Sequence, residues 1–381
     1  MLPVKDCTGC SACYNICPKN CISMVADNYG FLYPQINKDL CVSCSMCEKT
    51  CPVLNKVTQE TGNNVISYAA KTNDENTRKS SSSGGIFSVI AKNVLKNNGI
   101  VYGAAFDENF VVKHIGISSI DDLDLLRRSK YVQSNLNNSF VSVENNLKDG
   151  KTVLFSGTPC QVEGLLSFLK KSYDNLITMD FVCHGVPSPK VWECYKDYLK
   201  NKYKSNITDV NFREKSLGWK NFSLRIEFEN GNIYSTPFGN DPYMKAFLAD
   251  IDLLDSCYSC KFKSPRHKSD ITVADYWGID KINPEIDDDK GLSLVLVNTE
   301  KGVCVLEKAK LDLTLIKTDV EKIYPYNPCI IKPVTKHNFN EYFFYNYHKG
   351  DFLKTVNSCL NPSYITRLKR KILQIKTEMF K

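Results

Sequence analysis

Eight cysteines near the start of the chain fall into two copies of one spacing. The first copy reads C-x-x-C-x-x-C-x-x-x-C-P over residues 7–18, and the second repeats it over residues 41–52. Cysteine thiolates bind 4Fe-4S clusters at this spacing, and where two copies occur the fourth cysteine of each run binds the other cluster. We therefore predict two 4Fe-4S clusters. The first is expected on Cys7, Cys10, Cys13 and Cys51, and the second on Cys41, Cys44, Cys47 and Cys17.

A pair of zinc sites is the alternative interpretation, because C-x-x-C pairs also bind structural zinc. Zinc sites use four ligands in two pairs, usually separated by longer gaps. Two runs of the three-plus-one pattern fit zinc poorly. Cys21 lies outside both runs, and we expect it to pack as a small apolar side chain.

Two further cysteines stand in turns that join a predicted strand to a predicted helix. The first turn reads Ser156-Gly157-Thr158-Pro159-Cys160-Gln161, which predicts a capping box with proline at the first helical position. The second, over residues 180–189, carries Cys183 before a Ser-Pro helix start. Ligands bind at the carboxyl ends of strands in an open α/β sheet, so both turns are candidate site elements. The helix dipole is expected to lower the pKa of Cys160 and favour its thiolate.

Cys257 and Cys260 form one more C-x-x-C pair. This pair and the two single cysteines make four ligands, so we hypothesise a third 4Fe-4S cluster on Cys160, Cys183, Cys257 and Cys260. A zinc site on the same four residues, or a dithiol at the pair alone, is the alternative. The remaining single cysteines are expected to be packing residues; they are Cys194, Cys304, Cys329 and Cys359.

Two polar segments could bind a phosphate-bearing cofactor. Residues 80–86 read S-S-S-S-G-G-I, a small-residue turn that opens a helix. Its backbone N–H groups and hydroxyls could cradle a phosphate or a flavin pyrophosphate, and a plain helix cap is the alternative. Residues 128–134 read R-S-K-Y-V-Q-S, which adds a cation and a stacking ring. A solvated helix or strand end is the alternative there.

Size and composition favour a soluble, reducing setting. The chain has 381 residues, of which 43% are hydrophobic and 24% charged, so the part after Pro52 suffices for one large or two modest domains. No apolar run reaches membrane-spanning length and no signal peptide is recognised. Seventeen cysteines in such a chain argue for metal ligation in the cytoplasm rather than disulfides.

The formal net charge of +7 is no argument for a nucleic-acid partner. Each 4Fe-4S cube with four thiolates carries about −2, so two clusters would bring the protein to about +3 and three to about +1. No nucleic-acid-binding motif is recognised in the sequence either.

Short apolar runs alternate with helix starts after the cysteine-rich region, which predicts a parallel or mixed sheet with covering helices. A helix is expected over 83–97, and a hairpin over 222–235 around Asn230-Gly231. Strands are expected over 65–71, 100–106, 152–155, 176–181, 272–275 and 292–298. The fold class is therefore α+β or α/β, with an N-terminal two-cluster ferredoxin-type module followed by a mixed-sheet α/β domain.

A terminal helix is predicted from an apolar stripe at spacings of three and four. The stripe comprises Ile365, Leu368, Ile372, Ile375 and Met379. Basic residues cover the rest of the helix; they are Arg367, Lys369, Arg370, Lys371 and Lys376. One interpretation docks this helix on its own domain, and the other places it against a membrane surface or a partner.

The order of these motifs resembles the coenzyme F-420 (deazaflavin) hydrogenase/dehydrogenase beta-subunit family over about residues 5 to 340. The resemblance rests on the dicluster head, the Ser-Ser-Ser-Gly-Gly turn, Lys130–Ser134, Ser156–Gln161, Cys183–Pro189, Cys257 with Cys260, Asp270–Thr272, Asp275–Gly278 and Lys290-Gly291. The individual turns are weak signals, whereas their order is specific.

The resemblance implies FAD and electron relay between iron-sulfur clusters and the flavin. It implies FAD contacts at Ser82, Ser83, Gly84, Gly85, Lys130, Gln133, Ser134, Ser156, Gly157 and Thr158. Some family members use deazaflavin, and others accompany bacterial surface-polysaccharide synthesis. The Asn- and Lys-rich composition favours the second branch. The implied domains are 1–56 for the clusters and 65–340 for FAD (parts 65–150 and 151–340). Lys56–Asn64 is a linker, and 341–381 a basic helical tail.

The implied function is an oxidoreductase that receives electrons from a ferredoxin-like donor, or returns them to such an acceptor, and acts on an organic substrate through FAD. Low-potential clusters, on the order of −400 mV, would suit reduction of a difficult bond. No general acid or base is assigned, although His184 and Lys130 are candidates by position. Two rivals stay open: a non-catalytic electron-transfer subunit that serves a partner enzyme, and a redox sensor whose clusters report oxygen or iron.

Overall fold

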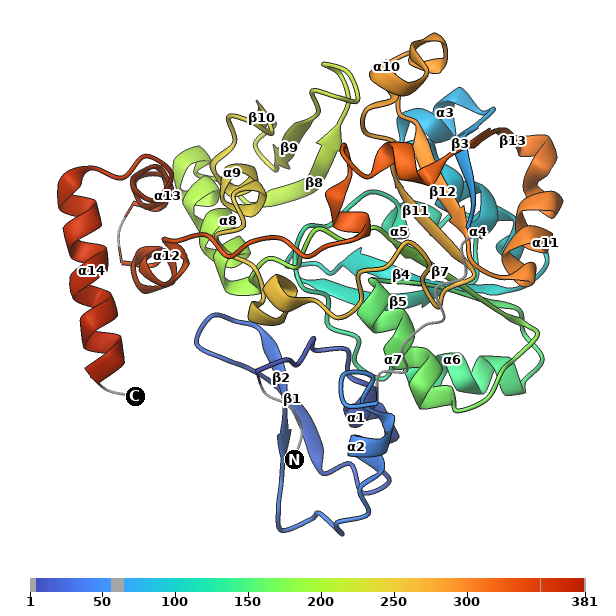
Figure 1. Ribbon diagram of the computed structural model, residues 1–381, viewed down its shortest axis with the longest axis horizontal. Coiled ribbons are helices and arrows are strands. Elements are labelled where there is room, and N and C mark those ends of the chain that lie inside the picture. The colour runs from blue at the N-terminus through green and yellow to red at the C-terminus, as the bar shows by residue number, and fades with distance from the viewer. Residues whose placement is uncertain (1–4, 56–64, 350, 380–381) are drawn as a thin grey trace.

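The computed structural model describes residues 5–55, 65–349 and 351–379. The proposed linker Lys56–Asn64 therefore lies outside the described residues. Figure 1 shows three parts: a small cysteine-rich module, a central α/β body, and a helical lobe that carries the C-terminal end. Within the described residues no helix is both long and apolar enough to span a bilayer.

The repeated cysteine spacing produces a repeated local structure in the N-terminal module. Helix α1 (Ala12–Ile16) and helix α2 (Met46–Thr50) follow Ser11 and Ser45, which both adopt a left-handed φ of 58°. Each helix ends at the fourth cysteine of its run, before the proline. Strands β1 (Ile22–Ala26) and β2 (Leu32–Ile36) pair antiparallel between the two runs.

An eight-stranded mixed sheet forms the centre of the body, in the order β13-β3-β12-β11-β7-β6-β4-β5. The middle strands β4, β6, β7 and β11 run parallel to one another, and antiparallel strands flank them. The strands are β3 (Ile66–Thr72), β4 (Ile100–Phe106), β5 (Val112–Ile117), β6 (Val153–Ser156), β7 (Leu176–Phe181), β11 (Ile271–Asp275), β12 (Ser293–Val297) and β13 (Leu313–Thr318).

Helices cover both faces of this sheet, because alternate strand residues point to opposite sides. On one face the core joins Val101 and Leu154 to α4 (Ile86–Lys96), α5 (Leu123–Leu126) and α11 (Glu300–Ala309). On the other face it joins Tyr102 and Phe155 to α6 (Ser139–Lys148) and α7 (Pro159–Leu169). The short helices α3 (Glu75–Lys79) and α10 (Ile279–Ile282) lie at the margin of the body.

A second, antiparallel sheet and a set of helices form the lobe beside the body. The sheet consists of β8 (Ile207–Glu214), β9 (Ser223–Phe228) and β10 (Ile233–Pro237). Its aromatic-rich core includes buried residues of α8 (Pro189–Tyr203) and α9 (Pro242–Leu248). The chain ends in α12 (Asn340–Asn346), α13 (Phe352–Leu360) and α14 (Tyr364–Met379).

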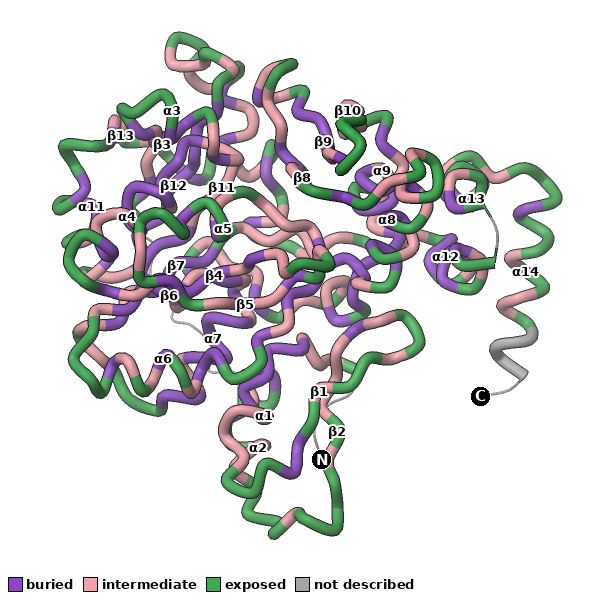
Figure 2. The backbone as a smooth tube through the Cα atoms, turned by 180° about the vertical axis from the view of Figure 1, so that it is seen from behind, coloured by how far each residue is buried: buried purple, intermediate pink, exposed green. Residues whose placement is uncertain are grey.

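The N-terminal module docks on the body and the lobe through separate contacts. Cys10 packs against Gly164 of α7, where a Cβ would lie 3.1 Å from the cysteine Sγ. The β1–β2 turn reaches the lobe, where the rings of Tyr29 and Phe344 lie 4.3 Å apart between centroids. Figure 2 shows buried segments running from α1 into the body, so the module packs as part of the molecule.

The predicted fold class is confirmed, because a ferredoxin-type module precedes a large mixed α/β sheet. The predicted strands 100–106 and 176–181 have the bounds of β4 and β7. The predicted hairpin is β9–β10, which turns at Asn230-Gly231. Strands from both sides of residue 150 join the same sheet. The domain boundaries stay a prediction.

Candidate functional site

The first predicted cluster site is a group of mutually close thiols that the fold largely buries. Burial, together with a smaller contribution from the neighbouring Cys51, raises the pKa of Cys7 to about 11. Burial raises the pKa of Cys13 to about 12, with added contributions from Cys7 and Cys51. Cys51, although it belongs to the second run, lies close to Cys7 and Cys13 of the first, and the crossed ligand assignment stays a prediction. Thiols with such raised pKa values ionise when a metal cation compensates the charge, so the group fits an iron-sulfur cluster.

The second predicted cluster site lies nearer the surface. Cys17, Cys41 and Cys47 pack around a small core that contains Cys21, and Cys44 is exposed. Cys21 is buried as expected, and its Sγ also lies 3.3 Å from the Sγ of Cys17. The second site is therefore the more exposed of the two.

A cavity of about 650 Å³ opens at the carboxyl ends of the parallel strands. Its wall takes in the ends of β6, β7 and β11, the small-residue turn before α4, and the polar segment 127–134. Nine of the ten predicted FAD contacts line it: Ser82, Ser83, Gly85, Lys130, Gln133, Ser134, Ser156, Gly157 and Thr158. The tenth, Gly84, packs behind the wall, where a Cβ would lie 2.3 Å from the carbonyl oxygen of Ala70.

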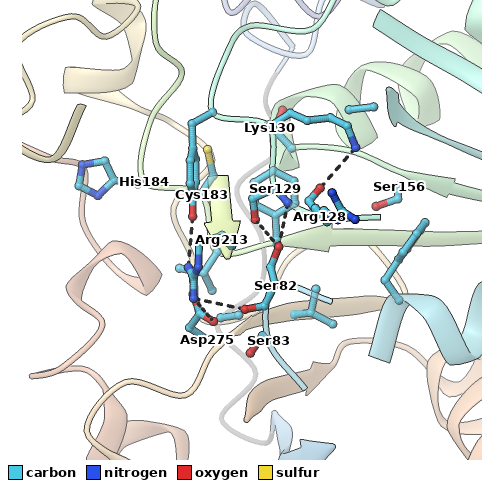
Figure 3. Close-up of a pocket in the computed structure, with 18 of the residues that line it drawn as sticks. Ser82, Ser83, Arg128, Ser129, Lys130, Ser156, Cys183, His184, Arg213 and Asp275 are labelled. Carbon is cyan, nitrogen blue, oxygen red and sulfur yellow. Dashed lines mark hydrogen bonds and ion pairs between the residues drawn. The ribbon is translucent and has the colours of Figure 1, made fainter. Parts of the chain in front are cut away.

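Hydrogen bonds tie the small-residue turn to the polar segment (Figure 3). The Oγ of Ser82 accepts from the backbone N–H of Ser129 at 2.8 Å and lies 3.1 Å from its Oγ. Lys130 donates from Nζ to the carbonyl oxygen of Arg127 at 2.7 Å. Burial, together with a smaller contribution from the adjacent Arg128, lowers the pKa of Lys130 to about 7. Lys130 therefore exchanges a proton near neutral pH.

Gln133 connects the cavity wall to the N-terminal module. Its Oε1 accepts from the backbone N–H of Leu32 at 2.8 Å, while its Nε2 is buried with no hydrogen-bond partner. The next residue, Ser134, lies 2.7 Å from His114 Nδ1, and the other ring nitrogen lies 3.0 Å from the carbonyl oxygen of Ser156. Burial lowers the pKa of His114 to about 4, so this histidine is a neutral structural link.

The four inner cysteines converge from three separate turns. Cys160 stands at the start of α7, Cys183 follows β7, and the C-x-x-C pair lies on a 3₁₀ turn over Asp255–Ser259 and the residue after it. Charge interactions connect the thiols to one another, and burial raises the pKa of both Cys160 and Cys183 to about 12. The predicted lowering of the Cys160 pKa is wrong, because burial outweighs the helix start. The capping box that is expected beside it is present.

The distances between the ligand side chains differ between a site for one metal ion and a site for a 4Fe-4S cluster. No three His, Cys, Asp or Glu side chains within the described residues are arranged to hold one metal ion. Each thiolate of a 4Fe-4S cube binds a different iron, so the ligands of a cube lie farther apart than those of one ion.

The inner cysteines lie between the N-terminal module and the cavity. Cys10 lies close enough to Cys160 to contribute to the raised pKa of that thiol. Thr8 and Gly9 line both the large cavity and a small cleft beside Cys7, Cys10, Cys13 and Cys51. Cys160 and Cys183 also line the large cavity. The thiol groups therefore form a succession from the molecular surface to the cavity.

Arg213 lines the cavity from β8, and no motif in the sequence pointed to it. Its guanidinium is buried, donates to Asp275 at 2.7 and 3.1 Å, and lies 4.0 Å from the ring centroid of Phe222. Its Nε has no partner. Trp277, which follows β11, also lines the cavity and stacks on Trp219 at 4.9 Å. Only the strand-end motif Asp275–Gly278 hinted at this wall.

The position of Cys329 differs from the one expected from the sequence. It is expected to be a packing residue, yet it lines the cavity and its Sγ lies 3.7 Å from His184 Nδ1. His184 Nε2 in turn lies 2.6 Å from Asp250 Oδ1. Burial alone would lower the pKa of His184, but these hydrogen bonds raise it to about 9. Cys304, also expected to pack, is exposed.

Two family models match parts of the chain. Residues 6–55 match the family model described as a 4Fe-4S dicluster domain. Residues 150–322 match the model that describes the C terminus of the beta subunit in coenzyme F420 hydrogenase/dehydrogenase. The chain therefore carries a region similar to a 4Fe-4S dicluster domain, followed by a region similar to the C terminus of such a beta subunit, which relates it to iron-sulfur electron-transfer subunits of the oxidoreductase type.

Two individual proteins are similar to parts of the chain. A polyferredoxin-like protein of Methanocaldococcus jannaschii is 39% identical over 57 residues, which cover 13% of this chain and 34% of that relative. The match thus spans about a third of the relative's length. A chain of the F420-reducing NiFe hydrogenase complex of Methanosarcina barkeri is similar in structure, with a TM-score of 0.46 and 17% identity over 72% of this chain and 90% of that chain.

Proposed function

We propose that the protein is an iron-sulfur flavoprotein oxidoreductase. It would pass electrons from a low-potential, ferredoxin-like donor through 4Fe-4S clusters to FAD and an organic substrate, in surface-polysaccharide synthesis. The observation that carries the proposal is the succession of thiol groups from the surface to a large cavity. A protein that only stored clusters would need no inner group beside such a cavity.

The cavity fits a large cofactor with polar groups. Its volume of about 650 Å³ lies within the range of about 300–1,000 Å³ that is typical of ligand sites. Its lining combines hydroxyl groups, such as those of Ser82 and Thr158, with the basic side chains of Lys130 and Arg213, which suits a ligand that accepts hydrogen bonds. FAD would supply the exchange between one-electron and two-electron chemistry there.

The inner cysteines fit a third 4Fe-4S cluster, which is the finer part of the proposal. They would hold it with Cys160, Cys183, Cys257 and Cys260, whose thiols interact electrostatically. Burial raises the pKa of Cys257 well above its usual value, so four thiolates could form there only against a strong positive charge. Irons supply that charge.

The chain's own side chains would manage protons in the cavity. Two-electron reduction of an organic substrate consumes protons as well as electrons, and Lys130 and His184 of the wall are the candidates to supply them. Lys130 has a pKa of about 7, so it exchanges a proton at neutral pH. His184 is held protonated by its contacts with Asp250 and Cys329. The ion pair between buried Arg213 and partly buried Asp275 also lines the cavity.

The decisive experiment quantifies iron, sulfide and flavin in protein purified and reconstituted without oxygen. About twelve irons per chain, as three cubes require, together with one FAD, are the expected result. About eight irons and no flavin would reduce the protein to a dicluster carrier and contradict the proposal.

A second test examines the flavin contact itself. Lys130→Met should lower the FAD content, because the substitution removes a cation from the cavity wall. Lys148→Met, at a lysine of α6 whose side chain is 54% exposed, is the matched control. Normal FAD content in the Lys130 variant would count against this placement of the cofactor.

The rival function, a relay subunit without a substrate of its own, predicts different kinetics. The cavity favours the enzyme, because its wall continues beyond the predicted FAD contacts to Arg213 and Trp277. Reduced viologen should support turnover of an added substrate if the protein is an enzyme. Reduction of the flavin without turnover across a broad substrate screen would favour the relay.

A further inference from the structure

Helix α14 (Tyr364–Met379) carries an apolar stripe that the other described residues leave exposed. In this stripe Ile365, Leu368, Ile372 and Ile375 are 64%, 42%, 54% and 57% exposed. Their spacings of three, four and three residues place them on one side of an α-helix. Tyr364 extends the stripe at its start and is 77% exposed. Single exposed apolar residues are normal on a protein surface, whereas a continuous stripe marks an interaction site.

The opposite side of the same helix is the one that packs on the lobe. Thr366 is buried. Arg370 donates from Nη1 to the carbonyl oxygen of Asn338 at 3.2 Å, and its guanidinium lies 4.9 Å from the ring centroid of Phe339. Positions 366 and 370 are one turn apart and face away from the stripe. The stripe therefore points outward because the helix is already anchored by its other face.

Charge around the stripe identifies its partner. At 100° per residue, Lys369 borders the stripe on one side, and Arg367 and Lys371 border it on the other. Residues 364–375 contain no Asp or Glu. An exposed apolar row between two basic rows is the pattern of a helix that lies in the interface of an anionic bilayer, with lysine heads reaching toward the lipid headgroups.

The place of the helix in the fold suits such a contact. Figure 1 shows α14 at the edge of the molecule, beside α12 and α13 and away from the central sheet. A flat surface could therefore reach the stripe without meeting the body. The helix is not long and apolar enough to cross a bilayer, so it would lie on the surface.

We propose that α14 docks the protein on the surface of an anionic lipid bilayer through the stripe Ile365, Leu368, Ile372 and Ile375 and its flanking basic residues. The proposal is independent of the cofactors and the substrate. It would hold a redox protein at a membrane where an amphipathic or lipid-linked substrate could enter, while the clusters stay in the aqueous phase.

Vesicle co-sedimentation of the full cluster-loaded chain tests the proposal. The probes are vesicles of phosphatidylcholine alone and of phosphatidylcholine with about a third phosphatidylglycerol. Binding is expected to the anionic vesicles only and to weaken with added salt. The double variant Leu368→Ser/Ile372→Ser should lose at least ten-fold in binding, because each buried apolar side chain contributes strongly. Leu311→Ser, at an isolated leucine that is 94% exposed, is the matched control.

Charge variants and oligomeric state complete the test. Lys369→Gln/Lys371→Gln should weaken anionic binding by about five-fold for each lysine, and the surface pair Lys148→Gln/Lys151→Gln should not. Iron content reports that each variant is folded. Absence of binding to anionic vesicles overturns the proposal. The wild-type protein could instead form a concentration-dependent dimer without binding vesicles, and the Leu368/Ile372 variant could abolish that dimer. This outcome also overturns the proposal, because a second copy of the chain would then cover the stripe.

Discussion

The N-terminal cysteines and the inner cysteines are built in opposite ways, although we assign the same kind of cluster to both. The N-terminal eight come from one short stretch in which each run carries its own helix and left-handed serine. The inner four come from a helix start, a strand end and a 3₁₀ turn that lie far apart in the sequence. The first region is partly exposed, whereas the second faces a cavity.

Under the proposed function, this difference gives the two regions separate tasks. A site near the surface can exchange electrons with a soluble partner, and its local construction keeps the ligands together wherever the module docks. A site made from three turns exists only when the body is folded, so it couples the clusters to the cavity. Loss of an inner ligand should therefore interrupt the path, whereas loss of an outer ligand should remove only its own cluster.

The largest effect is expected from Cys183→Ser. Iron should fall from about twelve to about eight per chain. Flavin reduction by a reduced ferredoxin should slow by at least a hundred-fold, because the proposed third cluster is lost. Stopped-flow absorbance measures the rate, and electron paramagnetic resonance should still show both N-terminal clusters. Cys304→Ser, at an exposed cysteine, is the control. Unchanged iron in the Cys183 variant would refute the third cluster.

Cys51→Ser tests the crossed arrangement of the N-terminal module. Cys51 belongs to the second run in the sequence, yet its thiol acts on Cys7 and Cys13. The variant should lose about four irons and expose Cys7, Cys10 and Cys13 to alkylation, which mass spectrometry can map. New reactivity at Cys41, Cys44 and Cys47 instead would show that each run keeps its own cluster.

The sequence predicted those features of the fold and of the site that depend on residues close together in the chain. The two cysteine runs are confirmed as a dicluster domain, and their ligand assignment stays a prediction. Strands such as 100–106 were found because an apolar run between turn signals suffices. Cys160 and Cys183 were expected at one sheet edge because both follow parallel strands, and both do line the cavity there.

Features that depend on packing could not be predicted in the same way. Arg213 lies within β8, and nothing in its neighbours indicates that a separate sheet brings it to the cavity. Cys329 contacts His184 only because the fold brings together two residues that lie 145 positions apart, with Cys329 Sγ 3.7 Å from His184 Nδ1. The pKa of Cys160 was predicted in the wrong direction, because its helix position is readable from the sequence and its burial is not.

A buried carboxyl should make the inner region sensitive to pH. Burial raises the pKa of Asp252 to about 7, and neither carboxylate oxygen has a hydrogen-bond partner. The unfolded chain releases this proton near pH 3.9, so between about pH 4 and 7 the folded state binds more protons and stability falls as pH rises. Asp252→Asn should therefore stabilise the protein, by about 2 kcal/mol more at pH 8 than at pH 5.5.

Thermal unfolding at the two pH values measures this effect. Asp174→Asn, at an exposed aspartate, is the matched control and should show no such difference. An equal gain for Asp252→Asn at both pH values would mean that the carboxyl has found a partner or that the unfolded state shares its pKa.

The smallest effect is expected at the contact between the two regions. A Cβ at Gly164 of α7 would lie 3.1 Å from both Cβ and Sγ of Cys10, and a cluster ligand has little freedom to move. Overpacking costs about 1–3 kcal/mol, and alanine returns about 1 kcal/mol of helix propensity. Gly164→Ala should thus lower stability by up to about 2 kcal/mol and alter the resonance signal of the cluster at Cys10. Gly239→Ala, where a Cβ meets nothing within 4 Å, should change neither. A Gly164 variant with an unchanged signal would mean that the module shifts freely on α7, and the path between the two regions would then depend on docking rather than on a fixed contact.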